Sequence, residues 1–123
     1  MDREEFEKVV EDVFDSLPAR FHATIENVHI VVEDLPDARV NRRQGIRSGG
    51  MLLGLYEGIP LTKRGVDYGM YPVLPDRITL FKHNIETVAR DGQDLREKIR
   101  EVLIHEIGHY YGMSETEIRR AGY

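Results

Sequence analysis

Residues 105–115 read HEIGHYYGMSE, and their spacing constrains the local fold more than any other part of the chain. His105 and His109 are four residues apart, so on an α-helix their side chains project from one side, about 40° apart. Gly112 can adopt a left-handed backbone conformation that ends such a helix and turns the chain. The segment therefore predicts a helix followed by a turn that returns Glu115 towards the two histidines.

The residue types in this segment suit a metal ion. The imidazoles of His105 and His109 and the carboxylate of Glu115 are zinc ligands, and three protein ligands leave a fourth zinc position open for water. Glu106 directly follows the first histidine and would lie beside that open position as a base. Because the chain has no cysteine, any zinc has to be held by imidazole and carboxylate. The alternative for Glu115 is a carboxylate that stabilises the start of the last helix through its charge.

This arrangement predicts a zinc-dependent peptidase that hydrolyses peptide bonds through a metal-bound water activated by Glu106. Hydrolysis also requires a hydrogen-bond donor for the developing oxyanion and a strand edge or groove for an extended substrate. The candidate donors are Tyr110, Tyr111, Tyr68, Tyr71 and His83. The sequence does not choose among them, although Tyr110 continues an apolar helical stripe and is expected in the core, whereas His83 follows a predicted strand.

Length and composition narrow the class of protein. With 123 residues, 41% of them hydrophobic and 32% charged, the chain is typical of a globular protein with a single domain over residues 1–123. Its net charge of −5 argues against a dedicated nucleic-acid binder. No apolar run approaches the ~20 residues of a membrane span, and the acidic residues 1–5 lack the apolar core of a signal peptide. We therefore expect a cytoplasmic protein that acts on a peptide or protein substrate and binds neither nucleic acid nor a membrane.

Apolar residues at helical spacing predict most of the helices. They indicate an amphipathic helix over residues 3–16, which the capping-box-like pair Asp2 and Glu5 would start. A longer apolar stripe predicts a helix from Asp94 through Tyr110, with the two histidines of the motif at one edge of the stripe, bordering a cleft. Shorter helices are predicted from Pro18 through Ile25, from an Asn84 cap through Ala89, and from the Ser114 and Glu117 pair towards Tyr123.

Three runs of β-branched or apolar residues have the length of strands, over residues 28–33, 51–56 and 77–82. The last run is apolar on both faces, so we expect it to pack against helices on at least one side. Gly54 in the second run leaves little side-chain bulk where another backbone could approach. Residues 37–50, with four arginines and three glycines, are predicted as a loop or hairpin, and residues 65–75 as a loop.

Sequence segments outside the motif carry a family resemblance. LLGLYEGIPLT at residues 52–62, LPDRI at residues 74–78 and the motif itself together resemble the small bacterial family of zinc metallopeptidases called minimal zincins. Residues 17–18 and 31–34 fit the same family, so the resemblance covers most of the chain.

The resemblance implies an α+β fold in which a small mixed β-sheet packs against helices, with the HExxH helix near the C-terminus. It also implies zinc as the cofactor, His105 and His109 as ligands and Glu106 as the base. Members of that family usually have aspartate where this chain has Glu115.

A second class of function is a zinc-binding regulatory or interaction module with little or no turnover. Only eight residues follow Glu115, which leaves no room for the downstream pocket segment of larger zinc peptidases. For this reason we expect a narrow or low peptidase activity. Glu106 favours the peptidase over the module, because a purely structural metal site has no use for a base.

Overall fold

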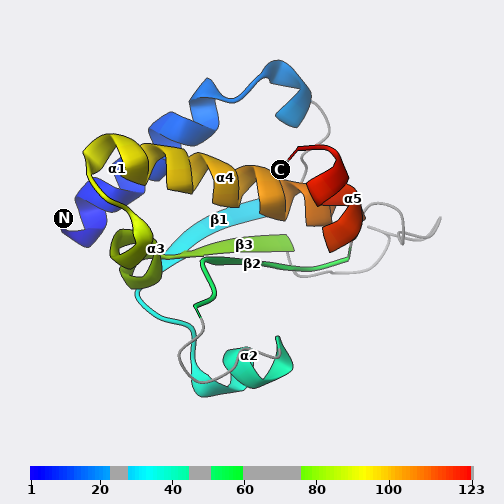
Figure 1. Ribbon diagram of the computed structural model, residues 1–123, viewed down its shortest axis with the longest axis horizontal. Helices are drawn as coiled ribbons and strands as arrows, with labels where there is room; N and C mark the ends of the chain where they lie inside the picture. The colour runs from blue at the N-terminus through cyan, green and yellow to red at the C-terminus, as the bar shows by residue number, and fades with distance from the viewer. Residues whose placement is uncertain (23–27, 45–50, 60–75, 123) are drawn as a thin grey trace.

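The computed structural model describes residues 1–22, 28–44, 51–59 and 76–122, and these residues form an α+β fold (Figure 1). In chain order the elements are α1 (Arg3–Ser16), the 3-10 helix η1 (Ala19–Phe21), β1 (Val28–Glu33), α2 (Ala38–Arg43), β2 (Gly54–Glu57), β3 (Asp76–Phe81), α3 (Lys82–Val88), α4 (Gly92–Tyr110) and α5 (Glu115–Arg120). None of the helices in these described residues is long and apolar enough to cross a membrane.

The three strands form a mixed sheet in the order β1-β3-β2. The central strand β3 runs parallel to β1, with Ile78 opposite Ile30, and antiparallel to β2, with Leu80 opposite Gly54. The small mixed sheet implied by the resemblance is therefore confirmed. Among the described strands β2 lies at one edge of the sheet, and it contacts the motif helix α4.

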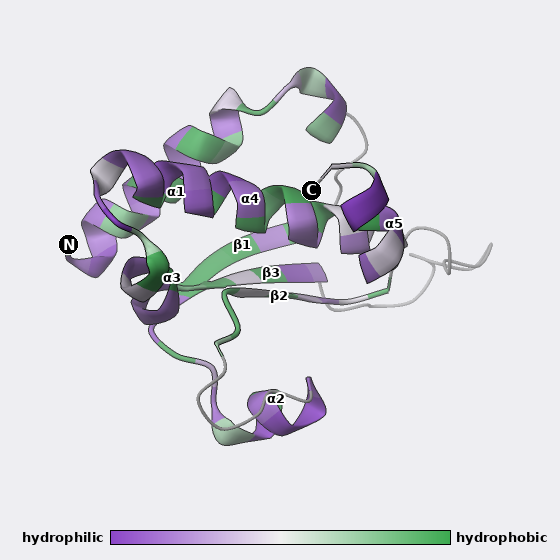
Figure 2. Ribbon diagram, viewed as in Figure 1, coloured by the Kyte–Doolittle hydropathy of each residue, from purple (hydrophilic) through white to green (hydrophobic). Residues whose placement is uncertain are grey.

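Helices α1 and α4 pack over one face of the sheet and enclose the core between them and the strands (Figure 1). The core is formed by apolar side chains that are almost fully buried, including Phe6, Val10, Val13, Ile78, Leu80, Ile99, Leu103 and Ile107. Hydrophobic residues accordingly mark much of β1 and form separate bands along α4, whereas α2 and α5 are mostly hydrophilic (Figure 2). Side chains from Leu95 to Tyr110 are buried along α4, so the core contacts the helix over most of its length, including the motif at its C-terminal end.

The predicted helix over residues 3–16 and the predicted strand over residues 28–33 are confirmed by α1 and β1. The side chain of Asp2 accepts a hydrogen bond from the Glu5 backbone N–H, as its capping role required. β2 and β3 are each shifted along the chain relative to the predicted runs, and the segment before β2 is not strand. The predicted helix end at Ile25 and the predicted loop residues 45–50 and 65–75 lie outside the described residues.

Two predicted helix starts were wrong. Asn84 does not cap α3 but lies inside it, because the helix begins at Lys82, directly after β3. Its buried amide donates instead to the Leu52 carbonyl oxygen at 2.9 Å and ties α3 to the chain that enters β2. The N-cap of α4 is Asp91, whose carboxylate accepts from the Asp94 backbone N–H at 2.8 Å, so Asp94 lies in the first turn of the helix.

The interpretation of residues 37–50 as loop was also wrong over its first half. Asp37 caps the short helix α2, accepting a hydrogen bond from the Val40 backbone N–H at 2.7 Å. Helix α2 has no buried residue, so the apolar periodicity on which helix prediction depends is missing there.

Gly54 allows α4 to lie directly against β2. A Cβ atom at this position would lie 2.4 Å from Cγ1 of Val102 and 3.4 Å from Cγ of Glu106. The first separation is far below van der Waals contact, so a larger residue cannot be accommodated without moving the helix or the strand. The same Cβ atom would lie 3.2 Å from the backbone carbonyl oxygen of Thr79 on β3. The expectation that Gly54 marks a close approach of another backbone is therefore confirmed, and two side chains of α4 lie close to it as well.

We expect Gly54→Ala to destabilise the protein by about 1–3 kcal/mol, because overpacking forces α4 away from β2. The free energy of unfolding in urea measures this effect. Gly92→Ala is the matched control, since a Cβ atom at Gly92 would meet nothing within 4 Å. If both variants unfold at the same urea concentration, the contact between β2 and α4 does not require glycine.

Candidate metal centre

The motif helix ends as its glycine predicts. Gly112 has a positive φ of 89°, its backbone N–H donates to the His109 carbonyl oxygen at 2.9 Å, and the Met113 N–H donates to the Gly108 carbonyl oxygen at 3.0 Å. These two bonds form a Schellman motif, which satisfies the last carbonyls of α4 and reverses the chain. The residues after Gly112 therefore return along the side of α4 that carries the histidines.

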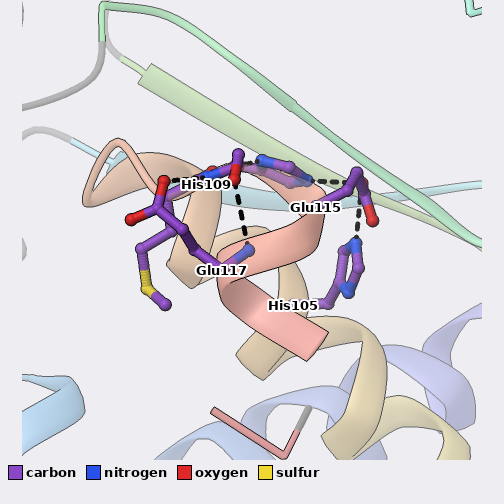
Figure 3. Close-up of polar contacts among 6 residues, drawn as sticks. His105, His109, Glu115 and Glu117 are labelled. Atoms are coloured by element: carbon purple, nitrogen blue, oxygen red, sulfur yellow. Dashed lines mark hydrogen bonds and ion pairs between the residues drawn. The ribbon is translucent and has the colours of Figure 1, made fainter. Parts of the chain in front are cut away.

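The returning chain starts α5 at once. Ser114 and Glu117 form the predicted capping box, in which the Glu117 N–H donates to the Ser114 hydroxyl and the Ser114 N–H donates to the Glu117 carboxylate, each at 3.1 Å. Glu115 is the first residue of this helix, and its side chain points towards the two histidines (Figure 3).

One carboxylate oxygen of Glu115 lies between the two imidazoles. The Nε2 atoms of His105 and His109 lie 3.0 Å and 2.8 Å from Oε1 of Glu115. One potential ligand atom from each of the three residues lies within 4.8 Å of the other two, a grouping that could hold a metal ion. The structure therefore brings together the three side chains that the sequence singled out as ligands.

The hydrogen bonds of His109 show that this grouping suits a cation. Its Nδ1 lies 3.1 Å from the Met113 carbonyl oxygen, which can only accept, so Nδ1 carries the proton and donates. In the neutral ring Nε2 is then an acceptor, and it faces a second acceptor, the carboxylate oxygen of Glu115. Two acceptors at this distance repel each other unless a proton or a cation lies between them. Two imidazoles and a carboxylate are a typical donor set for zinc, so the residues present fit that ion.

Glu106 is a buried carboxylate beside this cluster, with only 7% of its surface exposed. Burial raises the pKa of Glu106 above its usual value, while the nearby His109 and His105 and a hydrogen bond from the Tyr56 backbone N–H act in the opposite direction. A buried carboxylate with a raised pKa is suited to receive a proton and return it near neutral pH.

Glu115 is in a different electrostatic environment. Partial burial acts to raise its pKa, but the hydrogen bonds and the positive charges that His105 and His109 provide when their rings are protonated outweigh burial and lower the pKa below the usual value. The two glutamates of the site therefore differ in chemistry. The lowered pKa of Glu115 favours the charged carboxylate that binds a cation, whereas the raised pKa of Glu106 makes its carboxylate the stronger proton acceptor.

The cluster opens onto a pocket of about 810 Å³ between α4 and β2. The residues that line it come from β2 and the chain before it, from α4, from the turn after α4 and from the residue after α2, namely Leu52, Leu53, Gly54, Leu55, Tyr56, Glu101, Val102, His105, Glu106, His109, Gly112, Met113, Ser114, Glu115 and Gln44. The expectation that the histidines border a cleft is confirmed.

The candidate oxyanion donors lie elsewhere or outside the described residues. His83 is exposed on α3, at the opposite end of α4 from the cluster (Figure 1), and Tyr111 donates its hydroxyl hydrogen bond to the Arg20 carbonyl oxygen at 3.3 Å. Neither lines the pocket. Tyr110 is fully buried, as its place in the apolar stripe predicts. Tyr68 and Tyr71 are not among the described residues.

Two contributions to the site come from the backbone, and sequence reasoning missed both. The Met113 carbonyl orients His109, and the Tyr56 N–H donates to Glu106. A main-chain group carries no residue-specific signal. The Schellman turn does place a carbonyl near the second histidine, so the first contact could have been anticipated from Gly112.

Comparisons with known proteins show similarity in sequence pattern and in fold. A model of the zincin-like metallopeptidase family matches residues 25–123. Among solved structures, a conserved hypothetical protein from Thermo thermophilus is similar, with a TM-score of 0.59 and 24% sequence identity over 98% of both chains, which shows the fold alone. A search of curated proteins finds no match. Because the family model covers well over half of the chain, this protein belongs to the zincin-like metallopeptidase family.

Proposed function

We propose that the protein is a zinc-dependent peptidase in which His105, His109 and Glu115 hold the zinc ion and Glu106 is the catalytic base. One observation carries the proposal: three potential ligand atoms converge beside a buried carboxylate on the wall of an open pocket. Membership of a family of zinc metallopeptidases supports the same metal and the same class of reaction.

A zinc ion at this cluster would supply Lewis-acid polarisation of the scissile carbonyl and lower the pKa of water. The chain's own part is proton transfer and orientation. The Glu106 carboxylate accepts a proton from the attacking water and passes it to the nitrogen of the leaving amine. The Tyr56 N–H holds the Glu106 carboxylate in position, and the Met113 carbonyl fixes the tautomer and ring orientation of His109.

The pocket wall suits an extended peptide. β2 contributes Gly54, Leu55 and Tyr56 to the pocket, and within the described residues β3 pairs with one edge of β2 while no strand pairs with the other. An open strand edge can bind a peptide by adding a strand to the sheet. This arrangement supports a peptide or protein substrate.

We expect His105→Ala to lose the bound zinc and any peptide cleavage, whereas the wild-type protein retains about one zinc ion per chain after reconstitution. Two remaining ligands bind zinc much more weakly than three. Metal content of gel-filtered protein by elemental analysis, and cleavage of a peptide library by the same samples, measure the two effects.

His29→Ala is the matched control, because His29 is exposed on β1 and does not line the pocket. It should retain both zinc and cleavage. Wild-type protein that keeps no zinc at neutral pH contradicts the proposal. Zinc retention without any cleavage would favour the regulatory or interaction module instead.

A further inference from the structure

We propose that Gly108 and Ile118 act together as a positioning device for Glu115, holding α5 so that the carboxylate of its first residue faces both histidines. This inference rests on the proposed function, since it concerns how that site obtains its third ligand. Neither residue was a candidate for the site on the basis of sequence.

The evidence begins with how α5 is attached to the rest of the protein. Ile118 is the one buried residue of this six-residue helix, with 1% of its surface exposed. The capping box of Ser114 and Glu117 orders the first turn but lies within α5 and the residue before it. Ile118 is therefore the apolar anchor of α5, and the other residues of the helix are exposed.

The anchor lies against Gly108. A Cβ atom at position 108 would lie 2.9 Å from Cγ1 and 3.0 Å from Cδ1 of Ile118, so the isoleucine occupies the space that any other residue would fill. Glycine in a helix interior costs stability relative to alanine, and such a glycine usually has a packing reason. Here the reason is that the absence of a side chain at Gly108 leaves room for Ile118 to pack on the surface of α4.

The contact between Ile118 and Gly108 also determines where Glu115 lies, because both residues belong to the same short helix. Glu115 and Ile118 are three residues apart and so lie on the same face of α5. When Ile118 docks on Gly108, the Glu115 side chain is directed at α4, where His105 and His109 lie three residues before and one residue after the glycine. Packing around the Glu115 side chain itself contributes little to its position, since this side chain remains 55% exposed.

Gly108→Ala tests the proposal, with zinc affinity measured by competitive titration against a chelator. We expect the affinity to fall roughly tenfold or more, as for other groups that orient a metal ligand. The melting temperature of the metal-free protein should change little, because alanine favours the helix while it displaces α5. Gly92→Ala, in open space on the same helix, should leave zinc affinity unchanged.

Two double variants show whether the effect passes through Glu115. In a Glu115→Ala background, Gly108→Ala should cost no further zinc affinity, because the ligand that it displaces is already gone. Ile118→Ala alone should weaken binding by loosening α5. Gly108→Ala combined with Ile118→Ala should bind zinc more tightly than either single variant, since the new methyl group then occupies the space of the missing isoleucine atoms. Additive losses in both double variants would overturn the proposal.

A measurement on the metal-free protein keeps this test independent of zinc binding. Nuclear Overhauser contacts between the Glu115 side chain and the rings of His105 and His109 should be present in wild type and in Gly92→Ala, and absent in Gly108→Ala. Their persistence in Gly108→Ala overturns the positioning role. Wild-type protein that shows these contacts but binds no zinc would contradict the proposed function and leave the positioning role standing.

Discussion

Glu106→Gln is expected to abolish peptide hydrolysis while the protein still binds zinc. The amide of glutamine cannot accept a proton from the attacking water, although it matches the size of the carboxylate and keeps an oxygen for the Tyr56 N–H. Loss of a general base typically reduces the rate by about 10²–10⁴-fold. Cleavage of a peptide library by zinc-reconstituted wild type and variant, together with zinc content, measures both effects.

The same substitution, which removes activity, should increase the stability of the metal-free protein. Burial raises the folded-state pKa of Glu106 above its ordinary value of 4.5, so keeping the carboxylate charged in the fold costs free energy. The protonated form incurs no such cost. The stability linked to Glu106 is therefore fully present below the unfolded-state pKa and is lost as the pH rises through the raised folded-state pKa.

We therefore expect metal-free Glu106→Gln to be more stable than metal-free wild type at neutral pH, by on the order of 1 kcal/mol. The difference should shrink as the pH falls below the ordinary pKa of the carboxyl group. Urea unfolding across this pH range tests the sign. Glu101→Gln is a suitable control, because Glu101 lines the same pocket on the same helix but is well exposed. Equal cleavage by wild type and Glu106→Gln would mean that another group is the base.

The local geometry of the site could be predicted because it follows from short-range rules. The four-residue spacing of His105 and His109, the left-handed turn at Gly112 and the capping box at Ser114 each depend on neighbouring residues alone. Together they fix the path of the chain from the second histidine to Glu115. This explains why one segment of sequence predicted both the end of α4 and the return of Glu115.

The features that sequence reasoning missed depend on contacts between different helices and strands. Asn84 looked like a helix cap because local rules favour that role, yet its amide bonds to the Leu52 carbonyl, 32 residues away. No pattern in the sequence marks Gly108 as a packing position, and only the structure shows Ile118 of the next helix against it. In both cases the packing partner is set by how helices and strands assemble, which the local pattern does not encode.

The second large effect is expected for Glu115→Ala, which should lower zinc affinity roughly tenfold or more if the carboxylate is a direct ligand. Glu115→Asp should restore part of the lost affinity. The aspartate keeps the charge, but its shorter side chain starts from the same backbone position, which α5 holds in place, and so reaches less far towards His105 and His109. Competitive titration against a chelator gives the affinities.

The alternative role for Glu115 is a favourable charge at the start of α5, and a matched variant separates the two roles. Glu117 is also an acidic residue in the first turn of that helix, and glutamine can replace it in a capping box. Glu117→Gln therefore removes a first-turn charge, at a cost of about 0.3–1 kcal/mol in stability, without removing a ligand. Zinc affinity should fall in Glu115→Ala and stay at the wild-type value in Glu117→Gln. Equal small losses of stability with unchanged zinc affinity in both variants would show that Glu115 acts only through its charge at the helix terminus.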